Sequence, residues 1–402
     1  MGGPGLDPGL PSTDRQALKT PGEDQLDFNF TETQGMLRDT LRRYLSDTYD
    51  FDKRASMLRM DGGRDPGVWK ALATELGILG AALPEAHGGF GGGPVDSMVL
   101  MEEFGRAIAV EPYVPTVVIG GNALALTGGA HADALLPGII SGEVVIGAGF
   151  YEPQGRYNLA DLKTTAKADG SGWTLNGHKS VVVAAPYATH LLVSARTGGS
   201  QREGAGVSLF LVEANAKGLV RRDYPCVDGY MASEVYFENA NVGPHALLGA
   251  EGQALGLIET LVDHAAMAQC AEATGAMKKL HELTLDYAKQ RKQFGKAIGD
   301  FQVIQHRLVD MFMEAEQATS MTLMGTLRLD DPDRAKWVSQ AKAKINKGAR
   351  ALGQWAVQTH GGIGITTELA AGHYFKRLSI IETQFGDFDY HMGRLEERLL
   401  AA

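Results

Sequence analysis

The sequence has little of several features that would place a protein in a specialised class. Its 402 residues include two cysteines, Cys226 and Cys270, too few to hold a core together by disulfides. It has no CxxC pair or His-rich tract typical of a zinc site. No apolar run approaches the roughly 20 residues of a membrane-spanning helix, and the N-terminus lacks the basic-then-apolar order of a signal sequence. We therefore expect a soluble, reduced, cytoplasmic protein with no membrane contact and no metal site.

The sequence also lacks an excess of positive charge. Lys plus Arg total 38 against 48 for Asp plus Glu, which gives a net charge of −10. A protein that binds nucleic acid gains most of its affinity by neutralising phosphates, so this balance argues against a nucleic-acid partner. With 44% hydrophobic and 21% charged residues the chain is ordinary globular material, and its length favours two or three domains.

The first part of the chain predicts a tail followed by a helical domain. Residues 1–25 are rich in Gly, Pro and polar residues without periodicity, so we expect a disordered tail or an added extension. The N-terminal α-helical domain then covers residues 26–142, opening with capping-box spacing from Thr31 to Gln34. Apolar residues recur at helical spacing in three further segments: Val68–Leu79, Asp96–Ala107 and Gly121–Leu126.

The middle of the chain, residues 143–250, has a period of two and predicts an antiparallel β-barrel domain. The expected strands are Val144–Phe150, Trp173–Leu175, Lys179–Val183, His190–Ser194, Ser208–Val212 and Val235–Phe237. Asp169-Gly170 and Asn176-Gly177 are turn pairs, and the second is a strong hairpin signal.

The last part, residues 251–402, predicts a C-terminal four-helix bundle. Leu255–Arg291, Gln302–Leu329 and Asp333–Thr359 are long helical segments, far above the mean helix length of about 11–12 residues. The whole chain is therefore expected to be an α+β protein in the order helices, sheet, helices. It lacks the strand–helix alternation of a dinucleotide-binding Rossmann fold.

The motifs usually sought for catalysis are absent or weak. Gly88–Gly93 follows no strand and has no G-x-G-x-x-G pattern, so a turn between helices is the better interpretation. His264, His281 and His306 lie on helical segments without metal-ligand spacing. No G-x-S-x-G elbow occurs, which disfavours a serine hydrolase.

Several short motifs, taken together and in order, resemble the acyl-CoA dehydrogenase family from Phe28 to Leu400. They are Leu83-Pro-Glu-Ala-His-Gly-Gly89, Glu102-Glu-Phe-Gly-Arg106, Leu136-Pro-Gly-Ile-Ile-Ser-Gly-Glu143, Tyr151-Glu-Pro153, Asp161-Leu-Lys-Thr-Thr-Ala166, Leu175-Asn-Gly-His-Lys179, Tyr287-Ala-Lys-Gln-Arg-Lys-Gln-Phe-Gly295 and Gln358-Thr-His-Gly-Gly-Ile-Gly364. The resemblance implies the fold described above, an FAD cofactor and α,β-dehydrogenation of an acyl-CoA thioester. It also implies electron-transfer flavoprotein as a partner, and FAD shared between two subunits.

The nucleotide half of the FAD site is complete by this resemblance. Arg291 matches the arginine at the pyrophosphate, and its planar fork of donors suits phosphate oxygens. Phe294 matches the aromatic residue near the adenine, and Gln358 supplies an amide. Gly361 and Gly362 let the backbone approach the pyrophosphate. The alternative is that Arg291 is a solvated cation and the glycines form a helix C-cap.

The flavin half departs from the family pattern. The family usually has Trp-Ile-Thr or Trp-Ile-Ser where this chain has Val181-Val182-Val183, and the hydroxyl expected beside the flavin is therefore missing at Val183. The family's Ala-Gly-Ser-Asp is replaced by Gln154-Gly155-Arg156-Tyr157, and Tyr157 is far bulkier than serine near the expected ring. Backbone groups could still hold a flavin here.

The two positions at which the family carries its catalytic base also differ from the family pattern. The usual glutamate falls on Phe385, and the alternative position used by some members falls on Ala265, followed by Ala266. Glu382, Asp387 and Glu272 are the carboxylates near these positions, and Glu382 or Asp387 is our candidate base if the chain has one.

Three hypotheses follow from these differences. The first is the non-catalytic subunit of an α2β2 acyl-CoA dehydrogenase that lends Arg291, Phe294, Gln358 and Gly362 to FAD on a homologous partner. The second is a self-sufficient homotetramer that uses Glu382 or Asp387. The third is a scaffold subunit that binds no flavin. Steroid side-chain or dicarboxylic CoA esters are the substrates that the resemblance implies.

Overall fold

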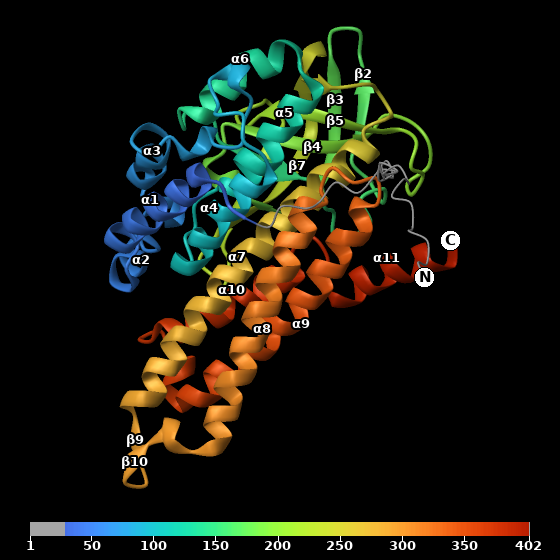
Figure 1. Cartoon of the computed structure of the whole chain (residues 1–402). Helices are drawn as coiled ribbons and strands as arrows, with labels where there is room; N and C mark the ends of the chain where they lie inside the picture. Colours follow the sequence, from blue (N-terminus) through green and yellow to red (C-terminus); the bar gives the residue numbers. More distant parts are fainter. Residues whose placement is uncertain (1–28, 402) are drawn as a thin grey trace, which may run out of the picture.

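The computed structural model describes residues 29–401, so the tail expected at residues 1–25 lies outside the described residues. A helical region, a sheet and a set of long helices follow one another along the chain, as expected (Figure 1). The helical region and the sheet lie together, and the long helices extend away from them to a small hairpin. The α+β fold predicted from the sequence is confirmed. None of the helices within residues 29–401 is both long and apolar enough to cross a membrane.

Short helices build the first region. They are α1 (Glu32–Thr48), α2 (Phe51–Met57), α3 (Pro66–Thr74), α4 (Pro94–Ala107), the π-helical segment Val114–Gly121, α5 (Asn122–Thr127) and α6 (Gly129–Ile140). The capping box is confirmed at α1, where Thr31 Oγ1 accepts from Gln34 N at 3.2 Å and Gln34 Oε1 accepts from Thr31 N at 3.0 Å. The loop Gly88–Gly93 is a connection between helices, as predicted.

A predominantly antiparallel sheet forms the second region. Its strands are β1 (Ile146–Gly149), β2 (Thr165–Ala168), β3 (Trp173–Val183), β4 (His190–Arg196), β5 (Val207–Glu213), β6 (Leu219–Pro225), β7 (Met231–Val242) and β8 (Leu247–Leu248). The order is β6-β7-β3-β2-β4-β5-β8, and β1 pairs with β4 in parallel. The sequence did not reveal β2, β6 or β8. The turn at Asp169-Gly170 is confirmed, because it connects β2 to its antiparallel neighbour β3.

The hairpin predicted at Asn176-Gly177 is wrong. Both residues lie inside β3, which is one strand rather than the two expected. The pairing of β3 with β7 shifts its register between Leu175 and Gly177, as at a β-bulge. A Cβ on Gly177 would lie 2.4 Å from Thr164 Oγ1, so the glycine permits a close approach of chain segments and does not form a turn.

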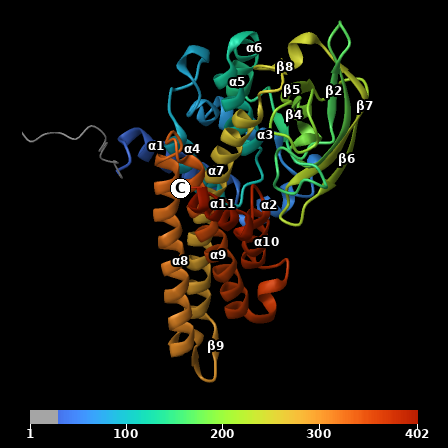
Figure 2. The same ribbon diagram turned by 90° about the vertical axis from the view of Figure 1, so that its right-hand side faces the viewer.

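Long helices form the third region. They are α7 (Leu255–Gln290), α8 (Gln302–Leu327), α9 (Arg334–His360), α10 (Ala370–Thr383) and α11 (Phe388–Ala401), with β9 (Lys292–Gln293) and β10 (Lys296–Ala297) forming the hairpin after α7. The three long helices expected from the sequence are confirmed. Figure 2 shows the sheet and α1 on opposite sides of α7.

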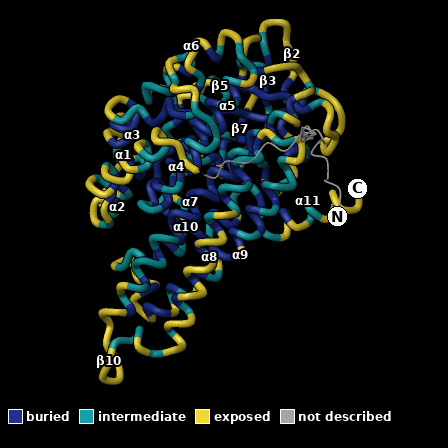
Figure 3. The backbone as a smooth tube through the Cα atoms, viewed as in Figure 1, coloured by how far each residue is buried: buried dark blue, intermediate teal, exposed yellow. Residues whose placement is uncertain are grey.

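Two glycines bring α4 and α7 close together. A Cβ on Gly105 would lie 1.9 Å from the carbonyl oxygen of Glu272, and one on Gly275 would lie 1.8 Å from that of Glu102. Neither position has room for any side chain. Buried residues continue from this crossing into the sheet and the bundle, whereas the far end of the bundle around β10 is exposed (Figure 3). This crossing fixes the place of the pocket described next.

Candidate functional site

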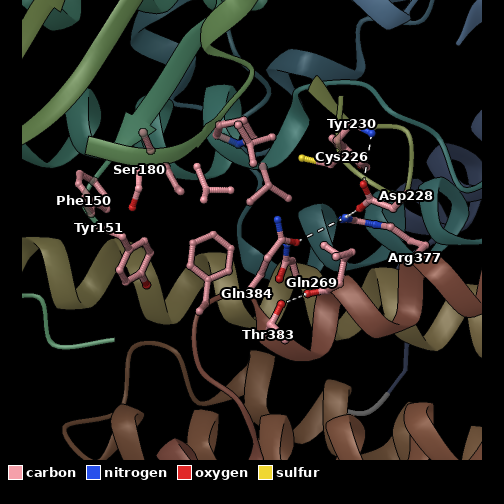
Figure 4. A pocket seen from close by; sticks show the side chains of 18 of the residues that line it. Phe150, Tyr151, Ser180, Cys226, Asp228, Tyr230, Gln269, Arg377, Thr383 and Gln384 are labelled. Carbon is pink, nitrogen blue, oxygen red and sulfur yellow. Dashed lines mark hydrogen bonds and ion pairs between the residues drawn. The ribbon is translucent and has the colours of Figure 1, made fainter. Parts of the chain in front are cut away.

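A pocket of about 410 Å³ lies where the first helical region, the sheet and the long helices meet. Its residues come from α4 and the segment after it, the loop after β1, the end of β3, the β6–β7 loop, α7 and the end of α10 (Figure 4). The lining is mostly apolar at α4 and in the π-helical segment, where it includes Met101, Phe104, Val114 and Ile119. Such a cavity suits an apolar ligand that is oriented by a few polar groups.

Phe385 occupies the position at which the sequence places the family's usual base. Its ring lines the pocket and lies 6.4 Å from the ring of Tyr151, centroid to centroid. Its φ of 57° is left-handed, a conformation that a bulky residue adopts only when the surroundings enforce it. The side chain placed here cannot accept a proton.

Side chains from α9 and α11 hold the turn that carries Phe385. Lys342 Nζ donates to the carbonyl oxygen of Ile381 at 2.6 Å, and Asn346 Nδ2 donates to those of Glu382 and Gly386 at 3.2 Å each. His391 Nε2 lies 3.0 Å from the carbonyl oxygen of Phe385. These donors bind carbonyls in the last turn of α10 and in the residues that follow it. The turn is therefore fixed by buried hydrogen bonds.

The two candidate bases are outside the pocket lining. Glu382 is buried and pairs with Arg350, whose Nε donates to Glu382 Oε2 at 2.9 Å. Asp387 accepts from the backbone N–H of Tyr390 at 2.9 Å, at the start of α11. Both carboxylates have a structural partner, and neither lines the cavity.

Glu272, the third nearby carboxylate, belongs to a buried ion network at one end of the pocket. Arg377 binds both of its oxygens at 2.6 Å and also donates to Asp228 at 2.7 Å. The guanidinium carbon lies 4.2 Å from the ring centroid of Tyr230. Figure 4 shows Asp228 and Arg377 at this end beside Gln269 and Gln384. Sequence reasoning missed Asp228 and Arg377, since they are 149 residues apart and neither belongs to a quoted motif.

Two more acids line the pocket, and both are engaged. Glu111 accepts from Tyr49 Oη at 2.8 Å and from Arg64 at 3.2 Å, and burial raises its pKa. Glu152 accepts from Lys179 Nζ at 2.7 Å. Burial opposes the ionisation of Glu152, but the charge and hydrogen bond of Lys179 outweigh it and lower the pKa to about 2.

The sequence contains a signal for Glu111 that the motifs do not capture. It is the one acid in the otherwise apolar stretch from Ile108 to Ile119, and lone acids in apolar runs are candidates for buried, partnered groups. Glu152 was quoted as part of a motif, but nothing in the motif indicated its partner Lys179. All the acids that line the pocket are thus ion-paired.

The side of the pocket expected to meet a flavin carries Ser180 and two valines from β3. Val181 and Val183 both line it at the end of β3. Tyr157 reaches the same cavity, and its ring lies 5.1 Å from that of Tyr390. Burial, followed by the charge of Asp387, raises the pKa of Tyr157 to about 12. No serine or threonine hydroxyl is present at the Val183 position.

The nucleotide-binding candidates gather at the opposite end of the bundle. Arg291 directly follows α7, and Phe294, which is 91% exposed, lies in the β9–β10 turn. Gln358, Gly361 and Gly362 are exposed around the end of α9. Tyr287 and His360 connect the two groups, because their rings lie 4.4 Å apart and Tyr287 Oη donates to the carbonyl oxygen of His360 at 3.3 Å. The structure therefore brings the two separate motifs together.

This cluster fits the phosphate end of a dinucleotide. A Cβ on Gly361 or Gly362 would meet no atom within 4 Å, so the backbone there is open to an approaching group. The side chain of Arg291 is exposed, and its guanidinium suits phosphate oxygens. The flavin side of the pocket lacks the corresponding donor at Val183. The residues present thus fit the nucleotide end better than the flavin end.

The two ends are far apart within one chain. Gln269 lines the pocket on α7 and Arg291 follows the end of the same helix. At about 1.5 Å per residue, this stretch of α7 spans roughly 33 Å. Among residues 29–401, no group of three or more His, Cys, Asp or Glu is placed to hold a metal ion.

Comparisons with known proteins match almost the whole described chain. Profiles of the acyl-CoA dehydrogenase N-terminal, middle and C-terminal domains match residues 31–143, 147–240 and 253–400. The chain is 28% identical to "Probable acyl-CoA dehydrogenase YngJ" of Bacillus subtilis, over 93% of this chain and 100% of that one. A solved structure of a variant of the "Tcur3481-Tcur3483 steroid ACAD" is 30% identical, with a TM-score of 0.83, and covers 92% of this chain and 98% of that one. The "FAD complex of PigA" is 25% identical, with a TM-score of 0.84, and covers 93% and 99%.

Proposed function

Because the chain belongs to the acyl-CoA dehydrogenase family, we propose that it is the subunit that completes the FAD site of a homologous catalytic partner. The observation that carries the proposal is Phe385, which lines the pocket at the position of the family's usual base. The other position used for a base is Ala265, which is buried and cannot accept a proton either.

The remaining carboxylates support the same proposal. Glu111, Glu152 and Asp228 line the pocket, and each is held by a cationic side chain. Glu382 is held by Arg350 outside the lining. A carboxylate already bound to a cation in the ground state is a weaker proton acceptor than a free one. This chain thus presents an acyl pocket without a free base.

The nucleotide cluster supplies the positive part of the proposal. Arg291, Phe294, Gln358 and the backbone of Gly361 and Gly362 would hold the ADP half of FAD. Since they lie roughly 33 Å from the pocket of the same chain, the flavin they serve would sit in another subunit. FAD supplies the hydride acceptor of the dehydrogenation when bound. The exposed Phe294 and Ile365 (73% exposed) offer that subunit an apolar contact beside the cluster.

We extend the proposal to the assembly and its substrates. The arrangement would be an α2β2 heterotetramer in the cytoplasm that oxidises an acyl-CoA and passes electrons to electron-transfer flavoprotein. The 30% identical structure is described as a steroid ACAD and carries two protein names. This favours a steroid side-chain CoA ester over a dicarboxylic one as the first substrate to assay.

Co-expression with homologous subunits encoded beside this chain tests the proposal. We expect the isolated chain to be colourless and inactive, and the complex to be yellow with one FAD for each pair of subunits. Glu382→Gln and Asp387→Asn in this chain should leave turnover of the complex unchanged. Turnover by the isolated chain, abolished by either substitution, would instead establish the self-sufficient enzyme. A complex without flavin would establish the scaffold.

A further inference from the structure

A second cavity of about 380 Å³ lies where α1, α2, α4, α7 and α10 meet. It shares no lining residue with the pocket described above. We call it the α2–α10 cavity. Its charged lining residues are Arg42, Asp50, Arg54, Glu103, Arg106 and Lys279, and its apolar ones include Leu45, Phe51, Ile108 and Leu283. Nothing in the proposed function uses this cavity.

Arg54 is a buried cation with no carboxylate partner within residues 29–401. It is 2% exposed. Its Nε donates to the carbonyl oxygen of Ile108 at 2.7 Å, its Nη2 to that of Asp228 at 2.8 Å, and its Nη1 lies 3.5 Å from His373 Nδ1. A guanidinium carries five N–H hydrogens. Within the described part of the chain, therefore, two of the five have no acceptor.

His373, the third hydrogen-bond partner of Arg54, is a neutral acceptor. Its Nε2 lies 3.3 Å from the carbonyl oxygen of Thr367, which can only accept, so Nε2 carries the hydrogen. Nδ1 is then the bare nitrogen that faces Arg54, and the ring is neutral. Burial lowers the pKa of His373, in agreement with this state. All hydrogen-bond acceptors of Arg54 are thus uncharged.

The other cations on the cavity wall are only partly compensated. Arg42 is paired with Glu103 through two hydrogen bonds of 2.9 and 2.6 Å. Arg106 and Lys279 share one carboxylate, Glu282, at 3.0 and 3.6 Å. Asp50 is engaged by Lys53 through its backbone N–H at 2.8 Å and its ammonium at 3.5 Å. Among the described residues, Arg54 forms no ion pair, although the carboxylate of Asp228, itself paired with Arg377, attracts it, and Arg106 and Lys279 have one carboxylate between them.

We infer that the α2–α10 cavity binds an organic anion, a carboxylate or phosphate group on a short apolar body. Arg54, Arg106 and Lys279 would receive the oxyanion, because the four cations of the wall outnumber its two carboxylates, and guanidinium and ammonium groups hold oxyanions by charge-assisted hydrogen bonds. Leu45, Phe51 and Leu283 would contact the apolar body. The inference is independent of the proposed function, since it needs neither flavin nor a partner subunit.

Calorimetric titration of the full-length chain tests this inference with three probes of equal chain length: hexanoate, hexyl phosphate and 1-hexanol. We expect saturable binding of an anion at one site per chain, at least tenfold tighter than 1-hexanol. The tighter anion identifies the carboxylate or the phosphate as the natural group. Binding of neither anion above the level of 1-hexanol would overturn the inference.

Two variants locate the site. Lys279→Glu reverses a partly exposed charge on the wall and should weaken anion binding at least tenfold. Lys70→Glu makes the same charge change on the exposed face of α3 and should leave binding unchanged. Arg54→Met should abolish binding, although its burial makes this variant the less certain to fold. Equal affinities for Lys279→Glu and Lys70→Glu would show that the anion binds elsewhere and would overturn the inference.

Discussion

The pocket end and the nucleotide end of this chain differ in what their charged residues do. At the pocket end, Glu111, Glu152, Asp228 and Glu272 are buried and bound to cations of the same chain. At the nucleotide end, by contrast, Arg291 is exposed and has no carboxylate partner in the described structure. Charged side chains in internal ion pairs belong to the folded structure, whereas an exposed charge without a partner, such as Arg291, is available to bind a ligand.

The two ends should therefore respond differently to mutation. Under the proposed function, changes at the pocket end cost stability, and changes at the nucleotide end cost FAD binding. The four predictions below test this separation.

The largest effect is expected at Arg377. Arg377→Met leaves Glu272 and Asp228 buried without their cation, which typically costs about 3–5 kcal/mol. The free energy of unfolding from urea titration should fall by that amount. The double variant Arg377→Met with Glu272→Leu removes one of the stranded charges and should recover part of the loss. Full stability of Arg377→Met would mean that the network contributes nothing to the fold.

The next effect concerns Arg291 in the complex. Charge-assisted hydrogen bonds contribute about 1.5–3 kcal/mol, so Arg291→Met should weaken FAD binding roughly tenfold to hundredfold. The unfolding free energy should change by less than about 0.5 kcal/mol, as for other surface changes. Lys289→Met, an exposed cation two residues earlier, is the matched control. An equal loss of FAD in both variants would remove Arg291 from the cofactor site.

Part of the fold could be predicted from the sequence and part could not. The long helices were predictable because their apolar residues keep a helical period. β6 was missed because Leu219–Pro225 is a strand at the sheet edge with a mostly exposed, charged sequence. Asn176-Gly177 gave a false hairpin because the glycine serves a close contact with Thr164, a neighbour that local sequence does not reveal.

The candidate site likewise has features that the sequence predicted and features that it did not. The position of Phe385 and the nucleotide cluster followed from motif spacing, because each belongs to a short, contiguous pattern. The contact between Tyr287 and His360 that unites the two nucleotide motifs did not, and neither did the ion pair of Arg377 with Asp228. Contacts between residues so far apart in sequence depend on how whole elements pack, which local patterns do not encode.

A pH titration of stability should reveal the pocket-end pair of Glu152 and Lys179. The pKa of Glu152 is lowered to about 2 in the folded chain, against an ordinary value of 4.5, so the unfolded state binds more protons between these values. Its contribution to stability is present above about pH 4.5 and is lost as the pH falls toward 2. Glu152→Gln should reduce the slope of the unfolding free energy against pH in this window. An unchanged slope would show that other carboxylates dominate the acid response.

The smallest effect is expected from Val183→Thr, which returns a hydroxyl to the pocket wall. Val183 is only partly buried, so the added polar group should cost at most about 1 kcal/mol of stability. We expect no gain of flavin in the isolated chain, measured from its visible absorbance, because under the proposed function the residues that would hold the nucleotide lie at the other end of α7. Val183→Ala controls for the change in packing. A yellow isolated Val183→Thr chain would contradict this expectation. It would mean that the pocket lacks only one hydroxyl for flavin binding, and the proposed division of FAD binding between two subunits would then be unnecessary.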